Sequence, residues 1–306
     1  MKTAVSISIG SSKRDKTVEI DLLGEKIRLE RRGTDGDMNA AAELYRALDG
    51  KVDAFGVGGA VLGLQVRDKW YPLKSCQVLT RYVTSTPVVD GTGFKTILER
   101  RAARVVDDNF SNEMENRRVL IVSGVDRYAL VEAFMDAGYE MVIGDLMFTM
   151  GIPIALHSEP SLVRVAKALI PVLGNVPFEW LYPTGSEQEK QVPKFIPTYE
   201  WASVLAGDCH YITHHLPERV PGKIVVTNTT TTEDRDLFKK AGIKHLVTTT
   251  PMLDGRSFGT NMMEAALVAL MGRKEPIDYR NSAEYMRALE TVIDEIGFEP
   301  EIQELN

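Results

Sequence analysis

The segment 117–148 constrains the fold most, because its apolar pattern changes from strand to helix and back to strand. Residues 119–122 form a short, continuous apolar run, which is typical of a parallel strand buried on both faces. Apolar residues then recur at helical spacing over 130–138, and a second apolar run, 141–143, ends at Gly144. This order predicts a βαβ unit, whose first turn directs backbone N–H groups at a ligand above the sheet.

Composition excludes several classes of protein. The chain has 306 residues, a formal net charge of −7 and interspersed charges, which argues against nucleic acid as the main partner. No apolar run approaches the length of a membrane span, and the N-terminus lacks a signal-peptide core, so we expect a cytoplasmic protein. Cys76 and Cys209 lie far apart, and His210 and His214 have no third ligand at motif spacing, so we predict no metal site.

The remaining patterns predict an α/β protein with two domains. We expect an N-terminal α/β domain over 1–115 and a Rossmann-like, doubly wound parallel-sheet domain over 116–306, whose last helix packs back on the first domain. Local predictions also include hairpins over 18–29 and 61–73, a helix over 38–48, a strand over 208–213 and an irregular segment over 174–200.

The turn of the βαβ unit is the predicted cofactor site. Asp145 follows Gly124 by 21 residues, about the spacing at which an acidic residue meets a ribose hydroxyl in dinucleotide-binding folds. The GxGxxG fingerprint is absent, since no further glycine follows Gly124 in this turn. We expect Ser123 and Gly124 to line the phosphate site, Arg127 to pair with a pyrophosphate and Asp145 to favour NAD over NADP.

Hydroxyl and amide side chains also gather where two later strands are predicted to end. Carboxyl ends of parallel strands meet at one edge of an open sheet, where such sheets bind ligands. Capping of the next helix accounts for one of the threonines in the first cluster. The candidate cofactor-binding residues from these two strand ends are Thr227, Asn228, Thr229 and Thr249.

One motif resembles a known family. Asp90-Gly91-Thr92-Gly93-Phe94, which opens a helix just before the predicted nucleotide domain, is similar to the DGxGF segment of the shikimate and quinate 5-dehydrogenases. In that family the aspartate pairs with a lysine from a PxK stretch, which matches Pro72-Leu73-Lys74 here. Without the resemblance, Asp90 is better interpreted as a helix cap and Lys74 as a surface lysine.

The resemblance implies a substrate domain followed by a nucleotide domain, with Lys74 and Asp90 as the catalytic pair. It further implies that Ser11, Ser12 and Asn261 bind a cyclic hydroxy acid and that Gly259 approaches the nicotinamide of NAD. The first hypothesis is therefore an NAD-dependent oxidoreductase that transfers a hydride at a ring hydroxyl. The alternative is a non-dehydrogenase Rossmann-like protein that binds an anionic small molecule or nucleotide between the domains. Whether the chain forms a homodimer is left open.

Overall fold

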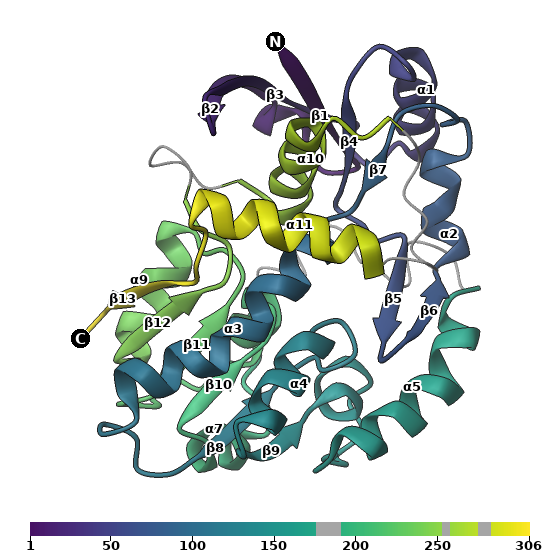
Figure 1. Cartoon of the computed structure of the whole chain (residues 1–306). Coiled ribbons are helices and arrows are strands. Elements are labelled where there is room, and N and C mark those ends of the chain that lie inside the picture. The colour runs from purple at the N-terminus through teal and green to yellow at the C-terminus, as the bar shows by residue number, and fades with distance from the viewer. Residues whose placement is uncertain (176–190, 253–257, 275–282) are drawn as a thin grey trace.

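The protein is described by a computed structural model that covers residues 1–175, 191–252, 258–274 and 283–306 (Figure 1). The strands of a five-stranded sheet are β1 (Lys2–Ser8), β2 (Lys16–Leu22), β3 (Glu25–Gly33), β4 (Ala54–Gly58) and β7 (Val88–Val89). Those of a six-stranded sheet are β8 (Arg118–Ile121), β9 (Glu140–Ile143), β10 (Val204–Ala206), β11 (Ile224–Thr227), β12 (His245–Thr248) and β13 (Glu301–Glu304). A separate hairpin consists of β5 (Gly63–Val66) and β6 (Lys69–Pro72).

The helices pack on both sheets and between them. They are α1 (Met38–Leu48), α2 (Lys74–Gln77), α3 (Thr92–Phe110), α4 (Tyr128–Asp136), α5 (Glu159–Leu173), α7 (Ile196–Trp201), α8 (Cys209–His215), α9 (Thr232–Ala241), α10 (Thr260–Met271) and α11 (Ala283–Ile296). Within the parts of the chain that are described, no helix is both long and apolar enough to span a membrane.

The first sheet has the strand order β2-β3-β1-β4-β7, with β2 antiparallel to β3 and the other pairs parallel. Because side chains alternate along a strand, β1 contributes to two separate cores. Val5 and Ile7 pack with Tyr45 of α1 on one face, whereas Ala4 packs with α10 on the other. The predicted helix over 38–48 and both predicted hairpins are confirmed.

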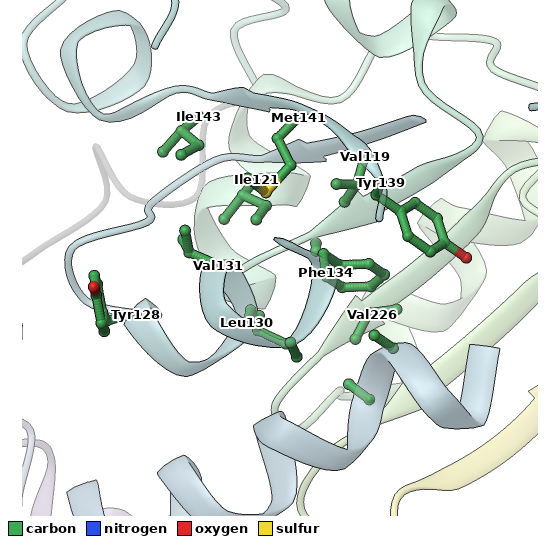
Figure 2. Packing of buried hydrophobic residues seen from close by; sticks show 14 of the residues in the cluster. Val119, Ile121, Tyr128, Leu130, Val131, Phe134, Tyr139, Met141, Ile143 and Val226 are labelled. Carbon is green, nitrogen blue, oxygen red and sulfur yellow. The ribbon is translucent and has the colours of Figure 1, made fainter. Parts of the chain in front are cut away.

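The second sheet is doubly wound, as the sequence predicts. Its order is β13-β12-β11-β10-β8-β9, in which β8 to β12 run parallel and β13 is antiparallel to β12. Val119 and Ile121 face the core beneath α4, while Leu120 faces the opposite core. Figure 2 shows Val131 and Phe134 of α4 against these strands. The chain leaves β9 and crosses to the far side of β8, so the switch point of the sheet lies between β8 and β10.

The prediction of a strand over 208–213 is wrong, because the helix α8 begins at Cys209. The strand β10 ends before this segment, at Ala206, and Gly207, whose φ is 144°, follows it. Asp208 then accepts a hydrogen bond from the backbone N–H of His210 at 3.0 Å and so caps α8. Asp208 and Gly207 therefore determine the local structure here. Both are local sequence features, and the apolar pattern of 208–213 outweighed them in the prediction. Of the predicted irregular segment, residues 176–190 lie outside the described residues, while 191–195 have no regular secondary structure and α7 follows.

The last helices return to the first sheet. Residues 263–269 of α10 are all buried, and this helix packs across β1 and β4. A Cβ on Gly56 of β4 would lie 2.7 Å from the carbonyl oxygen of Asn261, so the close approach of α10 requires glycine there. The helix α11 packs against α3 and α10, and in Figure 1 it lies across the middle of the molecule. We call residues 1–91 with α10 the first lobe, and residues 118–175 and 191–252 with β13 the second lobe; α3 and α11 lie between them.

Candidate functional site

The switch point of the second sheet is filled by a buried arginine. Arg127 follows the β8 turn, and only 4% of its side chain is exposed. Its guanidinium donates to Glu99 Oε1 at 2.6 Å and to Asp208 Oδ2 at 2.5 Å. Asp126 Oδ2 lies 3.2 Å from its Nε. The prediction that Arg127 pairs with a pyrophosphate is therefore wrong: three carboxylates from α3, from the turn itself and from the end of β10 already surround it.

Asp145, the predicted ribose-binding residue, is hydrogen-bonded to the turn after β8, where the phosphates of the cofactor were expected to bind. Asp145 accepts hydrogen bonds from the backbone N–H groups of Gly124 at 2.7 Å and Val125 at 2.9 Å. Sequence spacing therefore placed Asp145 correctly beside the turn, but its carboxylate uses the N–H groups assigned to a ligand. Burial raises the pKa of Asp145 to about 6, although the two N–H donors oppose this effect.

Two of the other candidate cofactor residues, Thr227 and Asn228, support the same network. Asn228 donates from Nδ2 to Asp208 Oδ2 at 3.1 Å and accepts the N–H of Cys209 at 3.2 Å. Thr227 is buried and donates to Asn228 Oδ1 at 3.0 Å. Thr249 is buried beside Thr227, whose carbonyl it binds through its backbone at 2.7 Å. Of the residues assigned to the cofactor here, Thr229 is partly exposed, and the buried Ser123 hydroxyl has no hydrogen-bond partner among the described residues.

The predicted catalytic pair is not formed. Asp90 is buried, and its carboxylate accepts the N–H of Leu62 at 2.7 Å and of Thr92 at 3.0 Å, so it joins the loop before β5 to the first residue of α3. Lys74 begins α2 and is exposed; within the described residues its side chain makes no hydrogen bond or ion pair. The assignment of Lys74 and Asp90 as a catalytic pair is therefore wrong, because two backbone N–H donors, one local and one 28 residues away, already hold the aspartate and the lysine is exposed to solvent.

Gly259 and Asn261 lie where α10 meets the first sheet. The Asn261 side chain donates to the hydroxyl of Ser6 at 2.5 Å, and a Cβ on Gly259 would lie 2.8 Å from Asn261 Oδ1. A Cβ on Gly91 would lie 2.6 Å from the N atom of Asn261. These contacts join α10 to β1 and to the start of α3, and they account for both residues without a ligand.

Two arginines that the sequence analysis missed converge beside the predicted substrate serines. A Cβ on Gly10, just after β1, would lie 2.8 Å from Arg14 Nη2, 3.3 Å from Arg31 Nη2 and 3.3 Å from Ser8 Oγ. Arg31 also donates to Asp15 Oδ1 and to the carbonyl of Ser11, each at 2.9 Å. Burial, and next the charge of Arg14, lower the pKa of Arg31.

The serines themselves are held within this loop. Ser12 donates from its hydroxyl to Asp35 Oδ2 at 2.6 Å, and Ser11 Oγ accepts the N–H of Lys13 at 3.2 Å. The structure thus brings Ser11 and Ser12 to the carboxyl ends of β1 and β3, next to the two arginines. The available sequence signal was the row of cations, Lys13, Arg14 and Lys16, that follows the serines.

The fold and this site define a two-lobed α/β protein with a doubly wound second sheet and polar residues at the carboxyl ends of its strands. The chain belongs to the family described as Domain of unknown function (DUF8754), whose profile matches residues 93–305; a second profile, Domain of unknown function (DUF8753), matches residues 3–90. No curated protein matches the chain.

Solved structures are similar only at low identity. An NAD-dependent malic enzyme from Thermotoga maritima is 12% identical with a TM-score of 0.37, over 95% of this chain and 84% of that one. Shikimate 5-dehydrogenase from Thermus thermophilus is 10% identical with a TM-score of 0.35, over 97% and 100%. A glucose-galactose binding protein from Geobacillus stearothermophilus is 10% identical with a TM-score of 0.36, over 100% and 97%. Dehydrogenases and sugar-binding proteins are thus both among the similar structures, and similarity this low does not choose between them.

Proposed function

We propose that the chain binds a small anionic molecule at the carboxyl ends of β1 and β3. The observation that carries this proposal is the convergence of Arg14 Nη2, Arg31 Nη2 and Ser8 Oγ around Gly10. Two guanidinium groups beside each other repel, and an anion between them would relieve this repulsion and form charge-assisted hydrogen bonds to both.

Four further features support an anion site. Arg14 has no carboxylate partner within the described residues, so its donors are available. Glycine at position 10 lets the guanidinium groups approach the backbone, since a Cβ there would nearly touch Arg14. The site also lies where parallel strands of α/β sheets commonly present ligands. In a chain of net charge −7, the local cations of this corner provide the charge that an anionic ligand needs.

Replacing Arg14 with glutamine is expected to weaken the binding of an organic anion about tenfold, because one charge-assisted hydrogen bond is lost. The measurement is a calorimetric titration of the full chain with cyclohexanecarboxylate, a probe that has a carboxylate and no hydroxyl groups. Arg46→Gln is the matched control, since Arg46 lies on α1 with 64% of its side chain exposed. Equal affinity of the wild type and Arg14→Gln, or no binding by the wild type, would rule out this anion site.

An NAD-dependent oxidoreductase similar to quinate and shikimate 5-dehydrogenases is a second proposal, and the position of one residue supports it. Asp145, just after β9, accepts the N–H of Gly124 at 2.7 Å. This places its carboxylate beside the position that the ribose of a dinucleotide takes in such folds. For NAD to bind, its ribose hydroxyls must replace the Gly124 and Val125 N–H groups on Asp145.

Mixing the protein with NADH tests this second proposal through the nicotinamide fluorescence. If NADH binds, NAD should bind more tightly than NADP, because the carboxylate of Asp145 accepts ribose hydroxyls and repels a 2′-phosphate. Tighter binding of NADP would contradict the role of Asp145. An unchanged fluorescence with both reduced cofactors would remove the dehydrogenase proposal and leave the anion site unaffected.

A further inference from the structure

The loop that carries Arg14 is fixed by the end of β3 and by the turn that follows it. The N–H of Asp35 donates to the carbonyl of Gly10 at 3.2 Å. Gly33 lets the two segments approach, because a Cβ there would lie 2.6 Å from the carbonyl oxygen of Ser11. A loop that is already ordered loses little conformational freedom when a ligand binds, which favours affinity.

Both arginines of the proposed anion site keep donors that a ligand can reach. Arg14 is exposed, and within the described residues its side chain makes no hydrogen bond or ion pair. Arg31 uses Nη1 for Asp15 and Ser11, whereas its Nη2 has no partner among the described residues and is accessible to solvent. Both Nη2 atoms lie within 3.3 Å of the point where a Cβ on Gly10 would lie, so one anionic group can bind both.

The register of the strands places a third cation beside the arginines. Lys16 of β2 lies directly opposite Arg31 of β3, so both side chains leave the sheet on the same face. The ammonium of Lys16 lies over the ring of Phe258, 4.5 Å from its centroid. Asp15, which binds Arg31 at 2.9 Å, is the carboxylate of this group. Arg14, Lys16 and Arg31 therefore exceed Asp15 by two positive charges.

The neighbouring charges offset one another. Asp35 accepts the hydroxyl of Ser12 at 2.6 Å and its N–H at 2.8 Å. These hydrogen bonds, and more weakly the charge of Lys13, lower the pKa of Asp35, so this carboxylate and this ammonium form a balanced pair. Glu30 likewise pairs with Arg32 at 2.8 Å. The excess of two positive charges around the anion site therefore remains.

The N-terminus of α10 reaches the same face of the sheet. Ser6 of β1 is paired with Arg31 in the parallel register, and its hydroxyl accepts the side-chain N–H of Asn261 at 2.5 Å. Gly259, the residue before α10, provides no side-chain cap, so the first N–H groups of the helix add positive potential on this face. This potential adds to that of the arginines.

We propose that the anion site selects the phosphate group of a small monoester over a carboxylate, which rests on the proposed function. A phosphate monoester carries about two negative charges at pH 7 and has three acceptor oxygens that point in different directions. It can therefore neutralise the excess charge and accept from both guanidinium groups at once. A carboxylate has one charge and two oxygens in one plane, so it satisfies this group of cations only in part.

Two probes with the same ring measure this selectivity. In calorimetric titrations of the full chain at pH 7.5, cyclohexyl phosphate is expected to bind about tenfold more tightly than cyclohexanecarboxylate. Arg14→Gln removes one of the two guanidinium groups, so the difference between the probes should shrink to about threefold or less. Arg46→Gln is again the control, and it should leave both affinities unchanged, since Arg46 has 64% of its side chain exposed on α1.

Gly10→Ala tests the convergence of the two arginines. The backbone of Gly10 does not have a positive φ, so alanine is compatible with it. The added methyl would lie 2.8 Å from Arg14 Nη2 and 3.3 Å from Arg31 Nη2, and it should push these flexible side-chain ends away from the site. We expect the affinity for cyclohexyl phosphate to fall about tenfold, with a nearly unchanged melting temperature. If Gly10→Ala does not fold, Arg14→Gln decides the matter.

Tighter binding of cyclohexyl phosphate than of cyclohexanecarboxylate, reduced in Arg14→Gln and in Gly10→Ala, supports the phosphate assignment. Equal affinities for the two probes overturn it and leave the anion site in place. Phosphate binding that both variants retain also overturns it, because the phosphate then binds elsewhere. Inorganic phosphate that binds more tightly than cyclohexyl phosphate would overturn the assignment to a monoester. If neither probe binds the wild type, the proposed anion site fails as well.

Discussion

Replacing Arg127 with methionine is expected to lower the free energy of unfolding by about 3–5 kcal/mol, the usual cost of removing one partner from a buried ion pair. Glu99, with 1% of its side chain exposed, and Asp208 would lose the guanidinium that hydrogen-bonds them at 2.6 Å and 2.5 Å. Methionine fills most of the vacated volume, so the loss reflects charge more than packing. Urea denaturation at neutral pH measures it.

Two further variants test whether the stability loss in Arg127→Met comes from its buried ion pairs: one at an exposed arginine, and one that removes both partners of a pair. Arg100 pairs with Glu132 at 3.3 Å, and 56% of its side chain is exposed, so Arg100→Met should change the stability by less than about 1 kcal/mol. Combining Arg127→Met with Glu99→Gln removes both partners, and the total loss should be smaller than the sum of the single losses. A loss below about 1 kcal/mol in Arg127→Met, together with weaker nucleotide binding, would instead restore the pyrophosphate role.

Local patterns predicted most of the fold. The apolar runs at 119–122 and 141–143 lie in β8 and β9 and at their ends, because a strand buried on both faces must be apolar throughout. The hairpin at 61–73 and the helix at 38–48 likewise depend on neighbouring residues alone. The strand expected at 208–213 failed because Asp208 acts as a helix cap, and a single capping residue outweighs a weak apolar pattern.

The candidate site was less predictable because its contacts are distant in the sequence. Arg127 stands at the start of a helix, where an anion would be expected, but its partners are 28 residues before it and 81 residues after it. No spacing rule indicates that Glu99 is the anion that pairs with Arg127. Asp145 was placed correctly by its spacing, and only the structure reveals that its acceptors are already used.

The short motif misled for a related reason. Asp90-Gly91-Thr92 has a structural role of its own, since Asp90 accepts the N–H of Thr92 and of Leu62, and Gly91, with φ of 93°, adopts a backbone conformation that favours glycine. A motif with such a structural role can occur without the distant lysine, here Lys74, that the resemblance requires. The orientation of Lys74 depends on how α2 packs, which no residue of the motif determines.

Glu264→Gln is expected to make the protein more stable at pH 8 and to flatten its loss of stability between pH 5 and 8. Glu264 lies in α10 and is fully buried; it accepts the hydroxyl of Tyr285 at 2.5 Å and the N–H of Phe94 at 3.2 Å. Burial, and next the charge of Asp90, raise its pKa from 4.5 to about 7. The folded chain therefore holds the proton more tightly than the unfolded chain, and stability falls as the pH rises from 4.5 through 7.

At pH 8 the ionised Glu264 costs the folded state about 3 kcal/mol relative to its protonated form, from a shift of this size at about 1.4 kcal/mol per pH unit. Glutamine keeps the acceptor for Phe94 and cannot ionise, so urea denaturation at pH 5 and pH 8 should give stabilities closer to each other than in the wild type. The remaining difference comes from other groups whose pKa values are shifted by burial, namely Asp145, with a pKa of about 6, Glu99, whose pKa is raised, and His215, whose pKa is lowered. Asp49 and Glu113, with pKa values of about 2, stay ionised in the folded chain throughout and add little slope above pH 5. Glu43→Gln, in which the altered side chain is 56% exposed, is the control and should retain the wild-type slope. If Glu264→Gln also retains it, the buried carboxyl does not titrate between pH 5 and 8, and the pH dependence comes from other groups with shifted pKa values, such as Asp145, Glu99 and His215.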